Sequence, residues 1–239
     1  MKVNSRLLPL SIAALTLSVG VINIAHAQEQ VVKIGHTGPL SGANAFAGKD
    51  NENGVRMAVD ELNTKKLVVG GKTLKFELVS EDDQCDPKAG MAVAQKMTDA
   101  GVKYVMGPYC SGVAIPTSKI YDEGGAILST VGSNPKVTMG GYKSVFRIIA
   151  GDNLIGSSMA QYAVTGLKAK TAGVIDDRTA FGQGLAEEFI KEAKVLGLTI
   201  VGQDFTTDKS IDFSAILTNM KGKSPDVIFY GGYAAQAGT

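Results

Sequence analysis

The run VMGPYCSG, residues 105–112, is the most informative stretch of this sequence. A short apolar segment with the character of a buried strand ends at Gly107, and a turn and then small residues with free backbone N–H groups follow. In an open α/β sheet, ligands bind outside the carboxyl ends of the strands. A turn at that edge that offers Ser111 and several backbone amides is suited to binding an anion. The run therefore predicts an α/β sheet with a ligand site at this edge.

The same alternation of strands and helices extends on both sides of this run. Strands are expected at 31–36, 74–80, 102–106, 126–130, 171–176, 199–204 and 226–230, and helices at 111–122, 153–167, 184–196 and 213–221. A glycine-rich loop is expected from Gly35 to Gly48. Repeated strand–helix units predict a mostly parallel sheet with helices on both faces.

Two local patterns fix helices near the start of the chain. Val55, Ala58, Val59 and Leu62 recur at the spacing of one helical face. Asp86-Pro87 predicts a helix start that continues to about residue 100, because Asp caps a helix and Pro suits its first position.

The run Gly151-Asp152-Asn153 marks a point where the chain crosses between two such sets of units. We therefore expect an N-terminal lobe at 28–150, a second lobe at 151–239, and a cleft between them. The sequence ends just after a loop that ordinarily leads into another helix. The second lobe is accordingly expected to be incomplete, as in a C-terminally truncated protein.

The first 27 residues have the pattern of a cleavable secretory signal peptide. Lys2 and Arg6 precede a largely apolar stretch from Leu7 to Ile24, which closes on the small-x-small sequence 25–27. A membrane anchor is the alternative, but polar residues interrupt the stretch. Cleavage leaves 212 residues with 22 Lys and Arg against 23 Asp and Glu, and no further membrane span. This charge balance gives no reason to bind nucleic acid or anionic lipid.

The chain has two cysteines, Cys85 and Cys110. In an exported protein this pair favours a disulfide, and a strand–helix–strand unit can bridge their 25-residue separation. Two buried free thiols are the alternative. A catalytic thiol is disfavoured, because the only histidine left after cleavage, His36, ends a different strand.

Several polar residues at strand ends are candidates for ligand binding. Ser111 and Ser133 follow adjacent strands, so together they offer a two-hydroxyl clamp for a carboxylate. Helix capping or turn formation is the alternative for either serine alone. Tyr233 follows a strand and two glycines and is expected to project into the crevice, unless it only completes a turn. Phe181 faces either the ligand or its own lobe's core.

Other chemistry is not supported by the sequence. The stretch from Gly42 to Lys49 has the wrong spacing for a phosphate-binding loop, and no zinc, hydrolase or dinucleotide motif is present. The acidic run 81–83 with Asp86 is interpreted as solvated loop carboxylates and a helix cap, not as a cation site. We therefore expect neither a cofactor nor a metal, and no enzymatic activity.

Taken together, seven short motifs resemble the periplasmic branched-chain amino-acid-binding proteins, the leucine/isoleucine/valine receptors of ABC importers. The motifs are KIG at 33–35, PLSG at 39–42, GKDNENG at 48–54, DD at 82–83, DPK at 86–88, GQGLA at 182–186 and YGG at 230–232. The resemblance covers the chain from about Val31 to Thr239. It implies the type I periplasmic-binding-protein fold, in which two α/β lobes close on a ligand.

The resemblance also implies roles for individual residues. Cys85 and Cys110 correspond to a disulfide of the first lobe. Ser111 and Ser133 are implied to bind the ligand's carboxylate through their hydroxyl and amide groups. The carbonyl of Val131, or that of Gly132, is implied to accept from the ammonium. Tyr109 is implied to contact the ligand's side chain, and Tyr233 to close over the ligand. The family often has Tyr where this chain has Phe181, and it can place an aromatic side chain near Phe46. The acidic partner of the ammonium is expected in residues beyond this sequence.

The function implied by the resemblance is capture of a free hydrophobic L-amino acid in the periplasm and its delivery to an inner-membrane ABC permease. The receptor is expected to act as a monomer. A ligand-sensing module for a related amino acid or amide is the first alternative. An exported hydrolase is the second, although no nucleophile–base pair can be assembled from this sequence.

Overall fold

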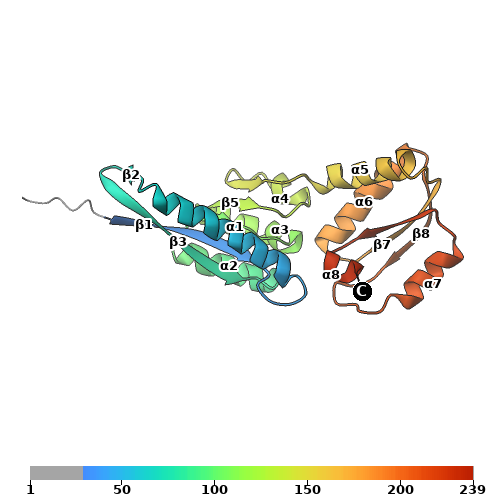
Figure 1. The fold of residues 1–239 in the computed structure, drawn as a ribbon, viewed down its shortest axis with the longest axis horizontal. Coiled ribbons are helices and arrows are strands. Elements are labelled where there is room, and N and C mark those ends of the chain that lie inside the picture. Colours follow the sequence, from blue (N-terminus) through green and yellow to red (C-terminus); the bar gives the residue numbers. More distant parts are fainter. Residues whose placement is uncertain (1–28, 239) are drawn as a thin grey trace, which may run out of the picture.

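The computed structural model describes residues 29–238 as two α/β lobes that lie side by side (Figure 1). The expected signal peptide, residues 1–27, lies outside the described residues. None of the helices within 29–238 combines the length and hydropathy that a transmembrane span requires.

The first lobe is built on a six-stranded sheet with the order β2-β3-β1-β4-β5-β6. Its strands are β1 (Glu29–Gly38), β2 (Val68–Val69), β3 (Lys72–Asp82), β4 (Tyr104–Met106), β5 (Ile127–Thr130) and β6 (Val145–Arg147). Its helices are α1 (Ala45–Thr64), α2 (Pro87–Asp99), α3 (Ser111–Glu123) and α4 (Lys136–Met139). Every pairing is parallel except that of β2 with β3. This confirms the mostly parallel sheet that the sequence predicts.

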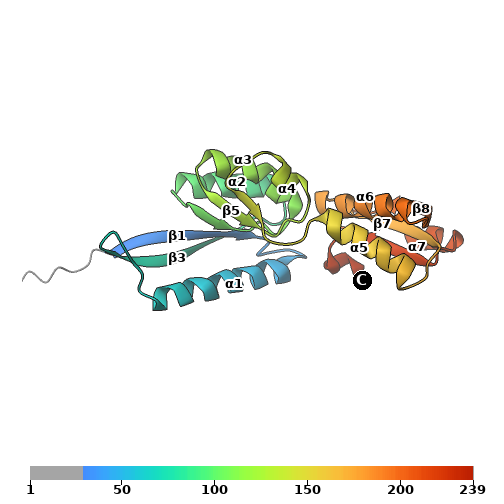
Figure 2. The same cartoon turned by 90° about the horizontal axis from the view of Figure 1, so that it is seen from above.

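Helices lie on both faces of this sheet. Figure 2 shows α1 on one side and α2, α3 and α4 on the other. Val105, Leu128 and Val145, one from each short strand, face α2 and α3 in a fully formed core with Met97 and Tyr121. Because side chains alternate along a strand, their neighbours point to the opposite face.

On that opposite face, the apolar side of α1 borders a mostly apolar hollow of about 480 Å³. Val55, Ala58, Val59 and Leu62 all line it, together with Ile34. The predicted helical face is therefore confirmed as one surface, but of the four only Val59 is buried.

The second lobe has a three-stranded parallel sheet with the order β8-β7-β9. Its elements are α5 (Asp152–Thr165), β7 (Thr171–Asp176), α6 (Ala180–Val195), β8 (Thr199–Phe205), α7 (Ser214–Gly222), β9 (Val227–Gly231) and α8 (Ala234–Ala237). Val174 of β7 faces the core that α5 and α6 form with Phe189 and Phe229. Gly173 points the other way, against Met220 of α7.

Three features of the first lobe differ from expectation. The loop expected from Gly35 to Gly48 spans only residues 39–44, because parallel pairing with β3 extends β1 to Gly38. The two-residue strand β2 and the one-turn helix α4 carry no clear periodic pattern and are not predicted. Short elements of this kind depend on their neighbours for stability rather than on local propensity.

Candidate functional site

The carboxyl ends of β4, β5 and β9 open onto one cavity between the lobes. Its volume is about 350 Å³, and its lining residues are Asn51, Tyr109, Ser111, Val131, Ser133, Ile149, Ile155, Phe181 and Tyr233. Parallel strands end at a common edge, so residues far apart in sequence meet there. Six of the seven predicted ligand residues line this cavity, and Gly132 does not.

The turn after β4 brings Ser111 to the cavity wall. At Gly107, φ is 108°, and a Cβ there would collide with the carbonyl of Thr37, so only glycine fits. The chain then enters α3, whose first residue is Ser111. The N-terminal N–H groups of a helix favour an anion.

Ser111 is 99% buried, and its hydroxyl already has one partner. Its Oγ accepts a hydrogen bond from the backbone N–H of Asn134 at 3.2 Å. A hydroxyl has one proton to donate, and no acceptor for it is found among residues 29–238. Ser111 can therefore donate to a ligand oxygen while its own oxygen is held in place.

A second loop, which follows β5, carries Val131 and Ser133. Thr130 Oγ1 donates to the carbonyl of Pro108 at 2.7 Å and accepts from the N–H of Gly132 at 2.9 Å, which ties this loop to the turn after β4. Gly132 packs against Ala114 of α3, so it supports the wall rather than forming it. Between the two candidates for the ammonium contact, only Val131 lies at the cavity.

Three aromatic rings form the apolar part of the site. Tyr233, just before α8, has its ring centroid 6.1 Å from that of Tyr109 in the first lobe and 5.1 Å from that of Phe181 in the second. Burial raises the pKa of both tyrosines, so both stay neutral and can donate hydrogen bonds. Phe181 was predicted to face either the ligand or the core of its own lobe. It does both, since it lines the cavity and also packs against that core. Phe46 is 60% exposed and does not line the cavity.

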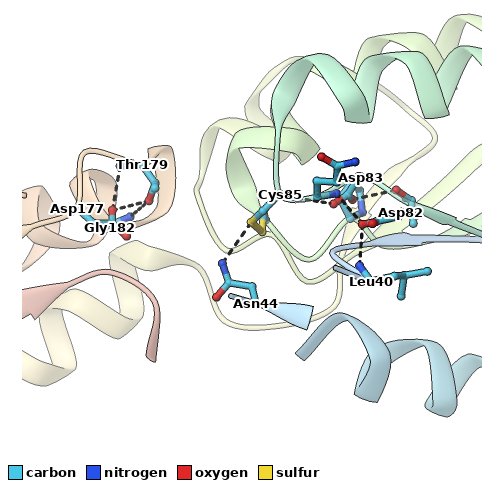
Figure 3. Close-up of a disulfide and its surroundings, with 12 residues drawn as sticks. Leu40, Asn44, Asp82, Asp83, Cys85, Asp177, Thr179 and Gly182 are labelled. Carbon is cyan, nitrogen blue, oxygen red and sulfur yellow. Dashed lines mark hydrogen bonds between the residues drawn. A yellow bond between two sulfur atoms is a disulfide. The ribbon is translucent and has the colours of Figure 1, made fainter. Parts of the chain in front are cut away.

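Cys85 and Cys110 form a disulfide directly behind this wall (Figure 3). Cys110 is the N-cap of α3 and immediately precedes Ser111. Asn44 Nδ2 lies 3.8 Å from Cys85 Sγ and donates to it. The disulfide thus links the loop after β3 to the turn that presents Ser111, and the alternative of two free thiols is excluded.

Asp82 and Asp83 shape the loop that carries Cys85 (Figure 3). Asp82 Oδ1 accepts from the N–H groups of Leu40 and Gln84, at 2.8 and 2.9 Å. Asp83 is fully buried and accepts from the N–H of Cys85 and the hydroxyl of Thr37, both at 2.9 Å. Burial raises the pKa of Asp83, and these two bonds oppose that rise.

The interpretation of the whole acidic run as solvated carboxylates is therefore wrong for Asp83. Its side chain belongs to the folded core because long-range pairing of β1 with β3 brings Thr37 to it. The predicted cap is confirmed: Asp86 accepts from the N–H of Ala89 at 2.8 Å and Pro87 opens α2. Within residues 29–238, no group of three or more His, Cys, Asp or Glu side chains is arranged to hold a metal ion.

Three lining residues are not predicted from the sequence. Ile149 and Ile155 flank the crossing point at Gly151, and Asn51 lies in the second turn of α1. The proximity of both isoleucines to the crossing point is a signal that sequence reasoning could have used. Asn51 has no such signal, because its place depends on how α1 packs beside the cleft.

Comparison with known proteins identifies the family. A model of the family described as periplasmic binding protein matches residues 31–239. The chain belongs to the periplasmic binding protein family. The solved structure of a periplasmic binding protein type 1 from Bordetella pertussis has a TM-score of 0.74 and 25% identity, over 83% of this chain and 55% of that one. The predicted type I fold is therefore confirmed.

Individual members of this periplasmic binding protein family are similar along most of the chain. The Leu/Ile/Val-binding protein BraC3 of Rhizobium johnstonii is 35% identical over 95% of this chain and 60% of its own length. The leucine-specific-binding protein of Salmonella typhimurium is 33% identical over 94% and 61%. The structure of LivJ from Streptococcus pneumoniae in complex with isoleucine has a TM-score of 0.74 and 27% identity, over 83% and 56%. The chain thus spans about 60% of the length of these curated relatives.

Proposed function

We propose that this protein is a periplasmic solute-binding receptor that captures a hydrophobic or branched-chain L-amino acid between its lobes and delivers it to an inner-membrane ABC permease. The observation that carries this proposal is that one cavity is lined both by two buried serines and by aromatic and aliphatic side chains. A free amino acid has the same division between a charged head and an apolar side chain. The names of the relatives, which include leucine, isoleucine and valine, support this ligand class.

The ligand's carboxylate lies at Ser111 in this proposal. Ser111 offers the proton of its hydroxyl and the N-terminal amides of α3, and charge-assisted bonds of this type are about twice as strong as neutral ones. The carbonyl of Val131 accepts from the ammonium, and Tyr109, Phe181 and Tyr233 surround the side chain. Because Tyr109 and Tyr233 belong to different lobes, ligand contacts from both sides favour the closed arrangement.

The lobes already contact each other around this cavity. Asn134 Nδ2 in the first lobe donates to the carbonyl of Ala180 in the second at 2.7 Å. The same residue's backbone N–H is the donor to Ser111 Oγ. A rotation that opens the lobes breaks the first of these bonds, which links closure directly to the loop that faces the ligand. The division into lobes at 150/151, the export signal and the monomeric state are part of the same proposal.

Calorimetric titration tests the function. We expect leucine, isoleucine or valine to bind to the oxidised protein, and leucinamide, which lacks the carboxylate, not to bind. Ser111→Ala should weaken binding of the amino acid by about 10- to 100-fold, because a hydrogen bond to a charged group contributes about 1.5–3 kcal/mol.

Ser118→Ala is the matched control for this variant. Ser118 is also buried in α3, but its hydroxyl donates to the carbonyl of Ala114, away from the cavity. Its removal should leave the affinity within about twofold, as expected for a site without ligand contact. Binding of leucinamide but of no amino acid would refute the proposed function, and so would equal losses in the two variants.

A further inference from the structure

The side chain of Asn134 joins the two lobes beside the proposed ligand site. Asn134 lies in the loop between β5 and α4 and is 95% buried. Its Nδ2 donates to the carbonyl of Ala180, the first residue of α6, at 2.7 Å. A carbonyl oxygen has two lone pairs, so Ala180 can accept this bond and still take part in its helix. The contact therefore costs α6 no hydrogen bond of its own.

The first lobe holds the rest of Asn134 in place. Its Oδ1 accepts from the backbone N–H of Lys136 at 3.0 Å, so the Nδ2 end of the amide is the end that meets the second lobe. Its backbone carbonyl accepts from the N–H of Val137 at 3.1 Å, and its backbone N–H donates to Ser111 Oγ at 3.2 Å. Asn134 thus presents a fixed donor to α6 while it is bonded to a serine that lines the cavity.

The second lobe reaches Asn134 because residue 184 is glycine. A Cβ added at Gly184 would collide with Asn134 Nδ2 and would lie 3.3 Å from Oδ2 of the buried Asp152. Gly184 follows Ala180 by four residues in α6, so both lie on the same face of the helix. A side chain at position 184 would push this face away from Asn134 and lengthen the bond to Ala180.

Apolar contacts also join the lobes, but they constrain the arrangement less closely. Tyr233 of the second lobe packs with Cys110 and Val113 of the first. Dispersion contacts of this kind are non-directional, whereas a hydrogen bond weakens steeply as its distance and angle change. The bond from Asn134 to Ala180 therefore favours one particular arrangement of α6 against the first lobe.

We propose that Asn134 is a positioning residue that sets the equilibrium between open and closed lobes: its bond to Ala180, which Gly184 permits, stabilises the closed state. Asn134 does not line the cavity, so it acts on the ligand through closure and not by contact. The closed state is the one in which Tyr109 of the first lobe and Tyr233 of the second meet around the cavity. This inference rests on the proposed function.

A residue that acts through closure has a signature that a ligand contact lacks. When only a fraction of the protein is competent to hold the ligand, the apparent dissociation constant is the intrinsic constant divided by that fraction. A smaller closed fraction therefore raises the dissociation constant of every ligand by the same factor. A substitution that alters contacts with the ligand's side chain changes the affinities for different ligands by different factors.

Asn134→Asp removes the donor and keeps the shape of the side chain. The carboxylate still accepts from the N–H of Lys136, but its second oxygen faces the carbonyl of Ala180, and two acceptors form no hydrogen bond. We expect about tenfold weaker binding of each aliphatic amino acid that the unaltered protein binds, by the same factor for each. Calorimetric titration measures the dissociation constants.

Gln183→Glu is the control for the added charge. Gln183 lines the same hollow between the lobes as Asn134, but its Nε2 donates to Glu187 within α6 at 2.9 Å. Its substitution introduces a negative charge in that hollow without breaking a bond between the lobes. The affinities should stay within about twofold of those of the unaltered protein, as for an ordinary surface change.

Gly184→Ala breaks the same contact without a change of charge. Alanine favours a helix more than glycine does, so α6 is expected to form in this variant. We expect the same uniform loss of affinity as in Asn134→Asp. Gly54→Ala is the matched control, because Gly54 also lies in a helix, α1, and a Cβ added there meets nothing within 4 Å. It should leave the affinities unchanged.

Binding kinetics provide a second readout, which a loss of folded protein would not produce. The ligand enters the open form, and the lobes must separate before it leaves. Asn134→Asp should therefore raise the dissociation rate about tenfold and leave the association rate within about twofold. Stopped-flow tyrosine fluorescence can follow both rates, because Tyr109 and Tyr233 line the cavity and the chain has no Trp.

The outcomes separate this inference from the proposed function. If the unaltered protein binds no amino acid, the proposed function fails. If it binds leucine and Asn134→Asp binds equally well, or loses affinity by factors that differ between ligands, the inference is wrong. An equal loss in Gln183→Glu also contradicts it, because charge alone then suffices.

Discussion

Removal of the Cys85–Cys110 disulfide is expected to lower the free energy of unfolding by about 3.5 kcal/mol, the value for a crosslink that closes a loop of about this length. The two cysteines are 25 positions apart, and the loop between them contains α2 and β4. The crosslink restricts the unfolded chain, so its loss stabilises the unfolded state. Urea unfolding of Cys85→Ala/Cys110→Ala beside the unaltered oxidised protein measures the difference.

Reduction of the unaltered protein is the matched comparison, because it breaks the same bond without a change of sequence. Treatment with dithiothreitol should lower its stability by a similar amount and should have no effect on the double variant. Leucine affinity should fall in both, since Cys110 is the residue immediately before Ser111, at the N-cap position of α3. A double variant within about 0.5 kcal/mol of the oxidised protein, the range of an ordinary surface change, would contradict this prediction.

Phe189→Ala should have the second large effect, a loss of about 3–5 kcal/mol of stability as for other buried Phe residues truncated to Ala. Phe189 of α6 is 99% buried and stacks on Phe229 of β9, with ring centroids 4.1 Å apart and planes 12° from parallel. Truncation removes the contact that joins α6 to the sheet of the second lobe and leaves a cavity in its core. Urea unfolding followed by circular dichroism measures the loss.

Phe46→Ala is the control for this substitution. It deletes the same atoms from α1, but the side chain of Phe46 is largely exposed. A change within about 0.5 kcal/mol is expected there, as at other exposed positions. If both variants were equally stable, the second lobe would not depend on the α6–β9 contact, and its core would have to be assigned to other residues.

Much of the fold follows from patterns that are local in the sequence. Apolar runs that end in glycine, and helical spacing between them, predict the order of strands and helices, because each element buries one side of itself. The rule that parallel strands share a carboxyl edge then places Ser111, Ser133 and Tyr233 near one another. Sequence reasoning needed no distances for this, because topology alone brings strand ends together.

Other parts of the site depend on contacts between distant segments. Asp83 is an acidic residue in an acidic run, and only the pairing of β1 with β3 buries it beside Thr37. The choice between the carbonyls of Val131 and Gly132 depended on the packing of Gly132 against α3. Neither contact leaves a periodic signal in the sequence.

Local patterns in the sequence predict the alternation of strands and helices, the two candidate serines and the pair of cysteines. Three features depend on long-range packing: the bond between the cysteines, the hollow beside the apolar face of α1, and the burial of Asp152. The physical reason is that periodicity reports which side of an element is apolar, whereas burial of a charge depends on which lobe surfaces meet. That meeting is set by long-range packing, which no short stretch of sequence encodes.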